Sequence, residues 1–324
     1  MSLPLAEAIK RQARVLGFSG VGIASAAPLP EHQRRFRRYL AEGRHGGMAY
    51  LAQEPDRREN PARLLPGAKS VISLAVPYYQ GDHGAPPADP CGRVARYAWG
   101  RDYHQATESR LEALKAFILE RAPGAAIRCA VDHAPILERA YAQQAGVGFI
   151  GKHTLLITPD HGSWVLLAEL ITDLELDPDE PGFTQCGTCT RCLDACPTGA
   201  LTEPFHLDAT RCIAYLTIEH KGEAPTELSR EVGDWLFGCD ICQEACPYNR
   251  IAALPPAFPE LHRDAGVGPW LSLEDASRPR SHGAFDRRFA ASPLHRAGRK
   301  GLRRNAHVVR NNQYTGDPLA GAIR

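Results

Sequence analysis

Eight of the ten cysteines lie between residues 186 and 246, in and around two short runs that share one spacing. The first run, CGTCTRCLDACP (186–197), reads C-x2-C-x2-C-x3-C-P, and CDICQEACP (239–247) repeats its second half. This is the spacing of bacterial ferredoxins, in which the fourth cysteine of a run ligates the other of two [4Fe–4S] clusters. The spacing therefore predicts two clusters whose ligands are shared between the runs.

Pairing the two runs completes one cluster and leaves the other short of one thiolate. Cys212 is the single spare cysteine nearby, so we expect it to be the missing ligand. The predicted ligands are Cys186, Cys189, Cys192 and Cys246 for cluster 1, and Cys196, Cys212, Cys239 and Cys242 for cluster 2.

Zinc is the alternative for these cysteines, because C-x2-C pairs also build zinc ribbons. A zinc site needs no C-x2-C-x2-C triplet, however, and neither run has its partner pair at ribbon spacing. The two remaining cysteines lie far away: Cys129, in a predicted strand, is expected to be a buried apolar side chain, and Cys91 has no predicted role.

Length and charge limit the classes of protein to consider. The 324 residues suit two or three domains, and a net charge of +1 gives no overall bias toward a polyanion or a membrane. The charge is uneven, since residues 278–310 hold ten Lys and Arg against one acid, and a second basic run is RRFRRYL (34–40). These runs are either solvated helix faces or a surface for a phosphate backbone.

Neither an export signal nor a membrane span is visible in the sequence. The first residues, MSLPLAEAIKRQARVLGF, mix charged and apolar types, and the longest apolar stretch, WVLLAELI (164–171), has only strand length and contains Glu169. We expect a cytoplasmic protein, and in the cytoplasm clustered cysteines favour metal over disulfide.

The elements that must position these cysteines begin with an N-terminal α/β (α+β) domain with a central sheet, predicted over residues 1–178. Apolar runs predict strands at 20–25, 70–76 and 126–131, and a pair at 154–158 and 163–172 joined by the turn PDHG. Helical spacing predicts helices at 5–18, 108–122 and 134–146. Residues 81–92 are expected to form a long loop.

A change of composition separates two further segments. The acidic, proline-rich stretch 173–183 reads as a linker, after which we expect a ferredoxin-like double-cluster domain over residues 179–252. A basic, partly helical C-terminal segment is predicted over 253–324. Because a ferredoxin needs no domain as large as the one that precedes these cysteines, the clusters are expected to feed electrons to a site in the N-terminal domain.

Asp132 is the candidate catalytic residue of that domain. It ends a predicted strand just before a predicted helix, a position where active-site groups are often placed. The alternative is an ordinary helix N-cap, a frequent role of Asp. Glu138 and Arg139, on the helix itself, are interpreted as helix surface or an ion pair.

Several long stretches resemble the epoxyqueuosine reductase family, and the resemblance covers nearly the whole chain. They are RRENPARLLPGAKSVIS (57–73), RYAWGRDYH (96–104), VDHAPILERAYAQQAGVGFIGKHTLLI (131–157), RCIAYLTIEHKG (211–222), FGCDICQEACPYN (237–249) and SPLHRAGRKGLRRNA (292–306).

The resemblance implies an oxidoreductase that acts on tRNA. The family reduces the epoxide of epoxyqueuosine to queuosine at the wobble position of tRNAs with a GUN anticodon, those for Asp, Asn, His and Tyr. It implies two [4Fe–4S] clusters, a base-off cobalamin in the N-terminal domain, an external low-potential electron donor and a monomer.

The resemblance also implies roles for individual residues. Asp132 matches the proton donor, which requires a pKa raised by burial against the corrin. Arg58, Asp132, Cys239 and Asp240 match cobalamin contacts, and the basic segment would meet tRNA phosphates through Arg299, Lys300, Arg303 and Arg304. The alternatives are a corrinoid reductive dehalogenase of a small molecule and a non-catalytic electron carrier.

Overall fold

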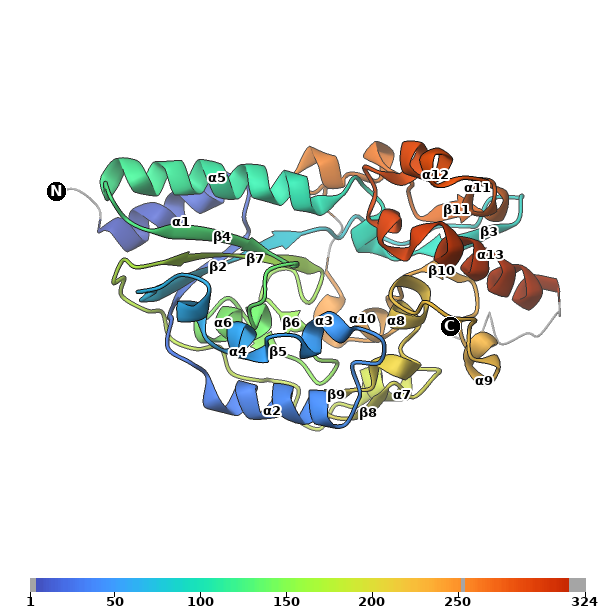
Figure 1. Cartoon of the computed structure of the whole chain (residues 1–324), viewed down its shortest axis with the longest axis horizontal. Helices are drawn as coiled ribbons and strands as arrows, with labels where there is room; N and C mark the ends of the chain where they lie inside the picture. Colours follow the sequence, from blue (N-terminus) through green and yellow to red (C-terminus); the bar gives the residue numbers. More distant parts are fainter. Residues whose placement is uncertain (1–3, 252–253, 315–324) are drawn as a thin grey trace.

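The computed structural model describes residues 4–251 and 254–314, and the predicted boundary at 252–253 lies outside that part. A four-stranded antiparallel sheet organises the N-terminal half (Figure 1). Its strands, in spatial order, are β1 (Gly20–Ser25), β2 (Ser70–Pro77), β7 (Val165–Thr172) and β4 (Ile127–Val131). The runs predicted as strands at 20–25, 70–76, 126–131 and 163–172 therefore all belong to this central sheet, with β4 at one edge.

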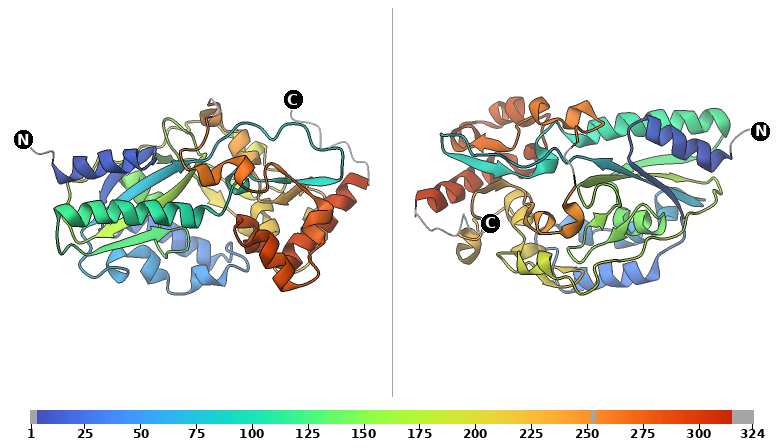
Figure 2. Two further views of the ribbon diagram at one scale, coloured as in Figure 1. Left: turned by 90° about the horizontal axis from the view of Figure 1, so that it is seen from above. Right: turned by 180° about the vertical axis from the view of Figure 1, so that it is seen from behind.

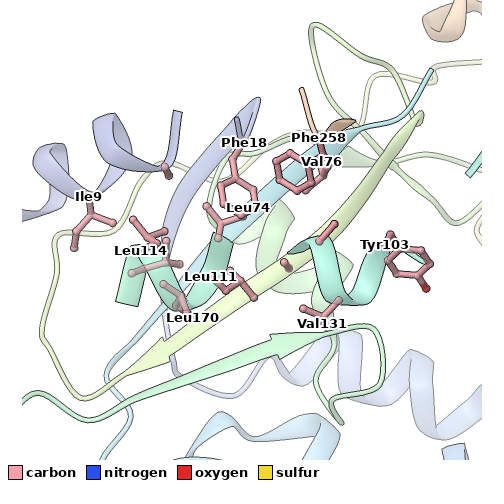
Figure 3. Close-up of a cluster of buried hydrophobic side chains, with 14 of the residues drawn as sticks. Ile9, Phe18, Leu74, Val76, Tyr103, Leu111, Leu114, Val131, Leu170 and Phe258 are labelled. Atoms are coloured by element: carbon pink, nitrogen blue, oxygen red, sulfur yellow. The ribbon is translucent and has the colours of Figure 1, made fainter. Parts of the chain in front are cut away.

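Both faces of this sheet are covered, which explains why its strands read as apolar runs. The helices α1 (Leu5–Val15) and α5 (Tyr103–Arg121) cover one face, and α6 (Glu138–Gln144) packs on the other (Figure 1). Figure 3 shows the core under α1 and α5, where Leu74, Leu111 and Leu170 are fully buried. Fully burying a leucine side chain contributes about 1.5–3 kcal/mol, so this core fixes the strands that carry the site.

Two sequence-based expectations for this half are wrong. The helix predicted from residue 134 begins at Glu138, because Pro135 restricts the residue before it and no helix forms ahead of it. Residues 154–158 do not pair with β7 as a strand: β6 (Leu156–Ile157) pairs with β5 (Phe149–Ile150), and only the bridge Thr158–Gly162 joins the two sides of the PDHG turn. Cys129 lies in β4 but is half-buried, and its thiol donates to Glu112 (3.2 Å).

The cysteine region is built from very short elements. Each ferredoxin-like run enters a one-turn helix, α7 (Arg191–Asp194) and α10 (Ile241–Glu244), and these two helices pack together. Around them lie β8 (Leu201–Glu203), β9 (His206–Leu207), α8 (Ile213–Ile218) and α9 (Thr226–Ser229).

A second sheet joins parts of the chain that the sequence suggested were separate. The expected loop 81–92 ends in β3 (Cys91–Val94), which lies between β10 (Trp235–Phe237) and β11 (Trp270–Ser272). All three predicted segments thus contribute one strand each. One core, which includes Val94, Leu236, Leu271 and Leu302, unites them.

The C-terminal helices cover this second sheet and lie at the end of the molecule away from the N-terminus (Figure 2). They are α11 (Leu273–Ser277), α12 (His282–Phe289) and α13 (Gly298–Tyr314). Three further helices precede β2: α2 (Pro30–Ala41), α3 (Ala49–Ala52) and α4 (Pro55–Glu59). The 3-10 turns are η1 (Pro61–Arg63), η2 (Arg96–Ala98), η3 (Ala209–Arg211), η4 (Pro247–Asn249), η5 (Pro259–Leu261), η6 (Arg263–Ala265) and η7 (Pro293–Ala297). None of the helices in the described residues has the length and apolar character needed to cross a membrane.

Candidate redox centre and active site

The four cysteines predicted for cluster 1 line one pocket, although they come from two distant runs. Cys186, Cys189 and Cys192 surround it from the first run, and Cys246 reaches it from the end of α10. Packing of α7 against α10 brings the two runs together. The other lining residues are Lys152, His153, Pro247 and Tyr248.

The cysteines predicted for cluster 2 also lie near one another, and their thiols show it electrostatically. Burial raises the pKa of Cys239 well above its ordinary value, and the neighbouring thiols of Cys242 and Cys212 raise it further. Burial likewise raises the pKa of Cys242, again with contributions from Cys212 and from Cys196. Thiols with pKa values raised in this way ionise readily only when a metal centre compensates their charge, since a coordinating thiol is deprotonated.

All ten cysteines are free, so no disulfide competes for these thiols. Neither set forms a close-set site for a single metal ion among the described residues. The assignment to multi-iron clusters therefore rests on the sequence spacing and on the family model reported below.

The loop that follows β5 closes over the cluster 1 pocket. Lys152 Nζ donates to the backbone carbonyls of Gly187 (2.6 Å) and Cys189 (2.9 Å), and so fixes the loop that carries the first cysteines. His153 is buried beside it. Burial and the charge of Arg139 lower its pKa to about 4, which keeps the ring neutral at pH 7.

Asp132 directly follows Val131, the last paired residue of edge strand β4. Its backbone has φ +32°, in the left-handed region that non-glycine residues rarely adopt, and such strain recurs at active sites. Asp132 is not a helix N-cap: Leu137 occupies that position of α6, without any side-chain capping bond. The structure therefore removes the alternative that the sequence left open, and the Asp132 side chain, 60% exposed, is available to a ligand.

The first turn of α5 supplies the partners of Asp132. Tyr103 donates its hydroxyl to Asp132 Oδ2 (2.7 Å), and His104 Nε2 lies 3.5 Å from the same oxygen. Asp102, the N-cap of α5, binds His104 Nδ1 (2.6 Å) and thereby orients the ring. Burial lowers the pKa of His104, but the two carboxylates outweigh it and raise the pKa to about 9, so the imidazole is charged at pH 7.

The raised pKa expected for Asp132 depends on burial against the corrin and stays a prediction; in the folded chain by itself the pKa lies below its ordinary value. Partial burial raises its pKa, but the hydrogen bonds from His104 and Tyr103 favour the carboxylate, and the net shift is downward. The sequence reasoning did not single out Tyr103 and His104, although both stand in the quoted stretch RYAWGRDYH. An Asp-Tyr-His triplet at a helix start was the signal available.

Two further carboxyl groups have pKa values that are raised, in contrast to that of Asp132. Burial, with the charge of Asp132, raises the pKa of Glu138 to about 8. Glu169, on β7, is fully buried, and neither of its carboxylate oxygens has a partner among the described residues; burial raises its pKa well above the ordinary value. Glu138 therefore differs from its interpretation as helix surface, whereas Arg139 is exposed and donates to Thr154 O (2.5 Å).

The predicted cobalamin contacts fall into two groups. Arg58 stacks over Tyr50 (5.9 Å), and its Nε is a buried donor without a partner in the described part of the chain. Burial lowers the pKa of Arg58, and the charges of Tyr50, Glu138 and Asp132 act on it, which places it beside Asp132. Asp240, next to Cys239, is turned inward instead, because Arg96 binds its carboxylate (3.1 Å).

The four residues predicted to contact tRNA differ in solvent exposure. Lys300 and Arg303 are exposed on α13, and Arg299 is half-buried. The Arg304 guanidinium forms hydrogen bonds within the protein: it donates to the carbonyls of Leu216 (2.5 Å), His220 (2.7 Å) and Gly222 (2.8 Å). The Arg304 side chain therefore ties α13 to α8 and its following loop, and it is only partly exposed.

Two family models match the chain. One, described as Epoxyqueuosine reductase QueG, DUF1730, covers residues 58–133, and the other, a 4Fe-4S double cluster binding domain, covers residues 185–249. A relative from Gloeobacter violaceus, named epoxyqueuosine reductase, is 41% identical over 324 residues, which cover 98% of this chain and 99% of the relative.

Solved structures are similar over the same extent. An epoxyqueuosine reductase with a tRNA-Tyr epoxyqueuosine-modified stem loop is 33% identical, with a TM-score of 0.87, and the match covers 95% of this chain and 81% of that one. The Bacillus subtilis enzyme, solved with its catalytic aspartate loop swung out of the active site, matches with the same identity and coverage and a TM-score of 0.86.

Proposed function

This chain belongs to the epoxyqueuosine reductase family, and we propose on that basis that it removes the epoxide oxygen of epoxyqueuosine in tRNA. The observation that best supports this proposal is that one chain combines two groups of four cysteines with a solvent-exposed Asp132 whose carboxylate contacts Tyr103 and His104. Conversion of the epoxide to the alkene takes two electrons and two protons and releases water. Thiol-bound clusters can pass the electrons, and the Asp132 network can supply a proton.

The chain carries two [4Fe–4S] clusters, and we assign their ligands as the sequence spacing predicts. The thiols fit this assignment, since each set is gathered on the folded chain and none is oxidised to a disulfide. His153 lines the pocket of cluster 1, and its Nε2, which is buried without a partner in the described part of the chain, fits the assignment as well. The ligand set of cluster 1 is Cys186, Cys189, Cys192 and Cys246, and that of cluster 2 is Cys196, Cys212, Cys239 and Cys242.

Base-off cobalamin is the proposed second cofactor, and the residues present fit it. The unpartnered Nε of Arg58 and the exposed carboxylate of Asp132 lie close enough to feel each other's charge, as polar contacts around one corrin would. Cys239 is the proposed contact on the side of cluster 2, whereas the Asp240 carboxylate is buried against Arg96 and is no longer assigned to this border. When bound, cobalamin supplies electron density to carbon for the reductive step.

The proton is held by the His104–Asp132 pair. In the folded chain it resides on the imidazole, whose pKa is about 9, while the Asp132 carboxylate accepts the Tyr103 hydroxyl. A substrate that covers the carboxylate removes water from it and raises its affinity for a proton. His104 Nε2, 3.5 Å away, can then pass its proton to Asp132 Oδ2, from which it reaches the departing oxygen.

The proposed substrate is the wobble nucleoside of tRNAs with a GUN anticodon. Lys300 and Arg303 are the exposed cations of α13 that can meet phosphate, and the inward-facing Arg304 is no longer assigned to that role. Phosphate contacts position a nucleic acid without reading its sequence. We propose that the enzyme works as a monomer in the cytoplasm, with an external low-potential electron donor.

The test is nucleoside mass spectrometry on tRNA that contains epoxyqueuosine, with anaerobically reconstituted protein, cobalamin and dithionite. The wild-type chain should form queuosine only when cobalamin is present. The matched variant Asp132→Asn should keep its iron, sulfide and bound cobalamin but lose about 10²–10⁴-fold in turnover, the usual contribution of a general acid. No conversion by wild-type protein with intact clusters would overturn the function, and normal turnover by D132N would overturn the acid.

A further inference from the structure

His153 has a hydrogen-bond donor without an acceptor at the wall of the cluster 1 pocket. The side chain is 3% exposed, and its Nδ1 accepts the backbone N–H of Leu155 (3.2 Å). In this tautomer Nε2 carries the hydrogen, because a neutral imidazole has one donor and one acceptor nitrogen. Nε2 is buried and has no partner within the described residues.

A buried N–H without an acceptor is a costly arrangement, and in native proteins it usually indicates an unseen partner. The pocket that His153 lines is the one formed by the four cysteines of cluster 1. Sulfur atoms are therefore the acceptors that this pocket can offer to the ring once the cluster is bound.

The turn that carries His153 is built to hold the ring in place. Gly151 and Thr154 close it through a backbone hydrogen bond (2.9 Å), and Thr154 takes the left-handed conformation (φ +71°). A Cβ atom on Gly151 would stand 3.0 Å from His153 Cε1 and 2.6 Å from Ile157 Cδ1, so glycine at this position lets the ring pack closely against the turn. The same edge of the ring is fixed by the Leu155 amide, which donates to Nδ1.

We propose that His153 Nε2–H donates a hydrogen bond to a sulfur of cluster 1 and thereby sets its reduction potential. The inference rests on the proposed function, because it requires the cluster ligands assigned above. When the cluster gains one electron from an external reductant, its net charge becomes more negative and its sulfurs become better acceptors. The donor therefore stabilises the reduced form and raises the potential, since hydrogen bonds to the sulfurs are among the factors that set it. His153 acts through the cluster and is not a catalytic residue.

The experiment is an EPR-monitored titration with dithionite on the reconstituted full chain, with iron and sulfide counted in every sample. His153→Phe keeps a ring but removes the donor, and His153→Met removes both. Both should lower the midpoint potential of one cluster with full iron content. His153→Gln, which retains a side-chain N–H, should restore the potential at least partly, and the control His161→Phe, which changes a partly exposed histidine outside this pocket, should leave it unchanged.

A spectroscopic readout identifies the bond itself. With ¹⁵N-histidine labelling, the reduced wild-type cluster should show a weak coupling to one ring nitrogen, and this coupling should vanish in H153F. Unchanged potentials in H153F and H153M at full iron content would overturn the inference. Loss of iron from both, with retention in H153Q, would support it, whereas loss of iron from H153Q as well would show that the ring serves packing only. Wild-type protein without two clusters would instead contradict the proposed function.

Discussion

A substitution of Arg96 is the change whose effect on the free energy of unfolding follows most directly from the structure. The Arg96 side chain is 3% exposed and its Nη1 donates to Asp240 (3.1 Å) and Glu244 (2.6 Å). The guanidinium lies over the ring of Trp164 (4.9 Å). Asp240 is 1% exposed and adjoins the proposed cluster ligand Cys239, so Arg96 compensates a carboxylate buried beside cluster 2.

The substitution Arg96→Met keeps most of the buried volume and removes the charge. Asp240 would then retain the backbone N–H of residue 96 (2.9 Å) and a long contact from Gln243 (3.4 Å), but no cation. Removing one partner of a buried ion pair costs about 3–5 kcal/mol, because the other charge remains buried and unpaired. We therefore expect the free energy of unfolding to fall by that amount, with loss of iron from cluster 2 as the Cys239 loop loosens.

The assay is anaerobic denaturant unfolding together with an iron count. The double variant Arg96→Met, Asp240→Asn should recover a large part of the loss, since it removes the stranded charge. The penalty of R96M alone should shrink as the pH falls: without Arg96 the folded pKa of Asp240 rises further above its unfolded value, so protonation at low pH relieves the cost. As a control, Arg35→Met breaks an exposed pair with Glu31 and should cost no more than about 0.5 kcal/mol. A cost below about 1 kcal/mol for R96M, or no recovery in the double variant, would refute the reasoning.

Three other changes have defined outcomes. Cys212→Ala should reduce the iron and sulfide content by about one cluster of two, and an unchanged content would mean that a different group is the fourth ligand. Tyr103→Phe removes one hydrogen bond that favours the Asp132 carboxylate and should therefore raise the Asp132 pKa. The high-pH fall in turnover, which reports loss of the proton from the His104–Asp132 pair, should move upward, and an unmoved profile would contradict the proton assignment. Glu169→Gln should remove a pH dependence of the free energy of unfolding, because the folded pKa of Glu169 lies well above its unfolded value. Wild-type stability should therefore decline relative to that of E169Q as the pH rises above about 4.5, by at most about 1.4 kcal/mol per pH unit. Parallel stability curves would show that Glu169 ionises without cost.

The chemistry of the clusters was accessible from the sequence because it is local. A C-x2-C-x2-C loop places three thiols around one cluster through the geometry of a single turn, whatever the rest of the chain does. The strands of the central sheet were accessible for a related reason, since burial on both faces imposes continuous apolar runs such as residues 70–76. Even the choice of Cys212 followed from counting, and the fold places its thiol among the others.

The tertiary structure decided what depends on residues distant in sequence. No local signal showed that Cys91–Val94 would pair with strands more than a hundred residues away, or that Arg304 would turn inward toward α8. The sign of the Asp132 pKa shift could likewise not be predicted, because burial and the hydrogen bonds donated from another helix act in opposite directions. Spacing along a chain determines which atoms can meet within one turn, whereas pairing, burial and charge balance arise only when separate segments pack against each other.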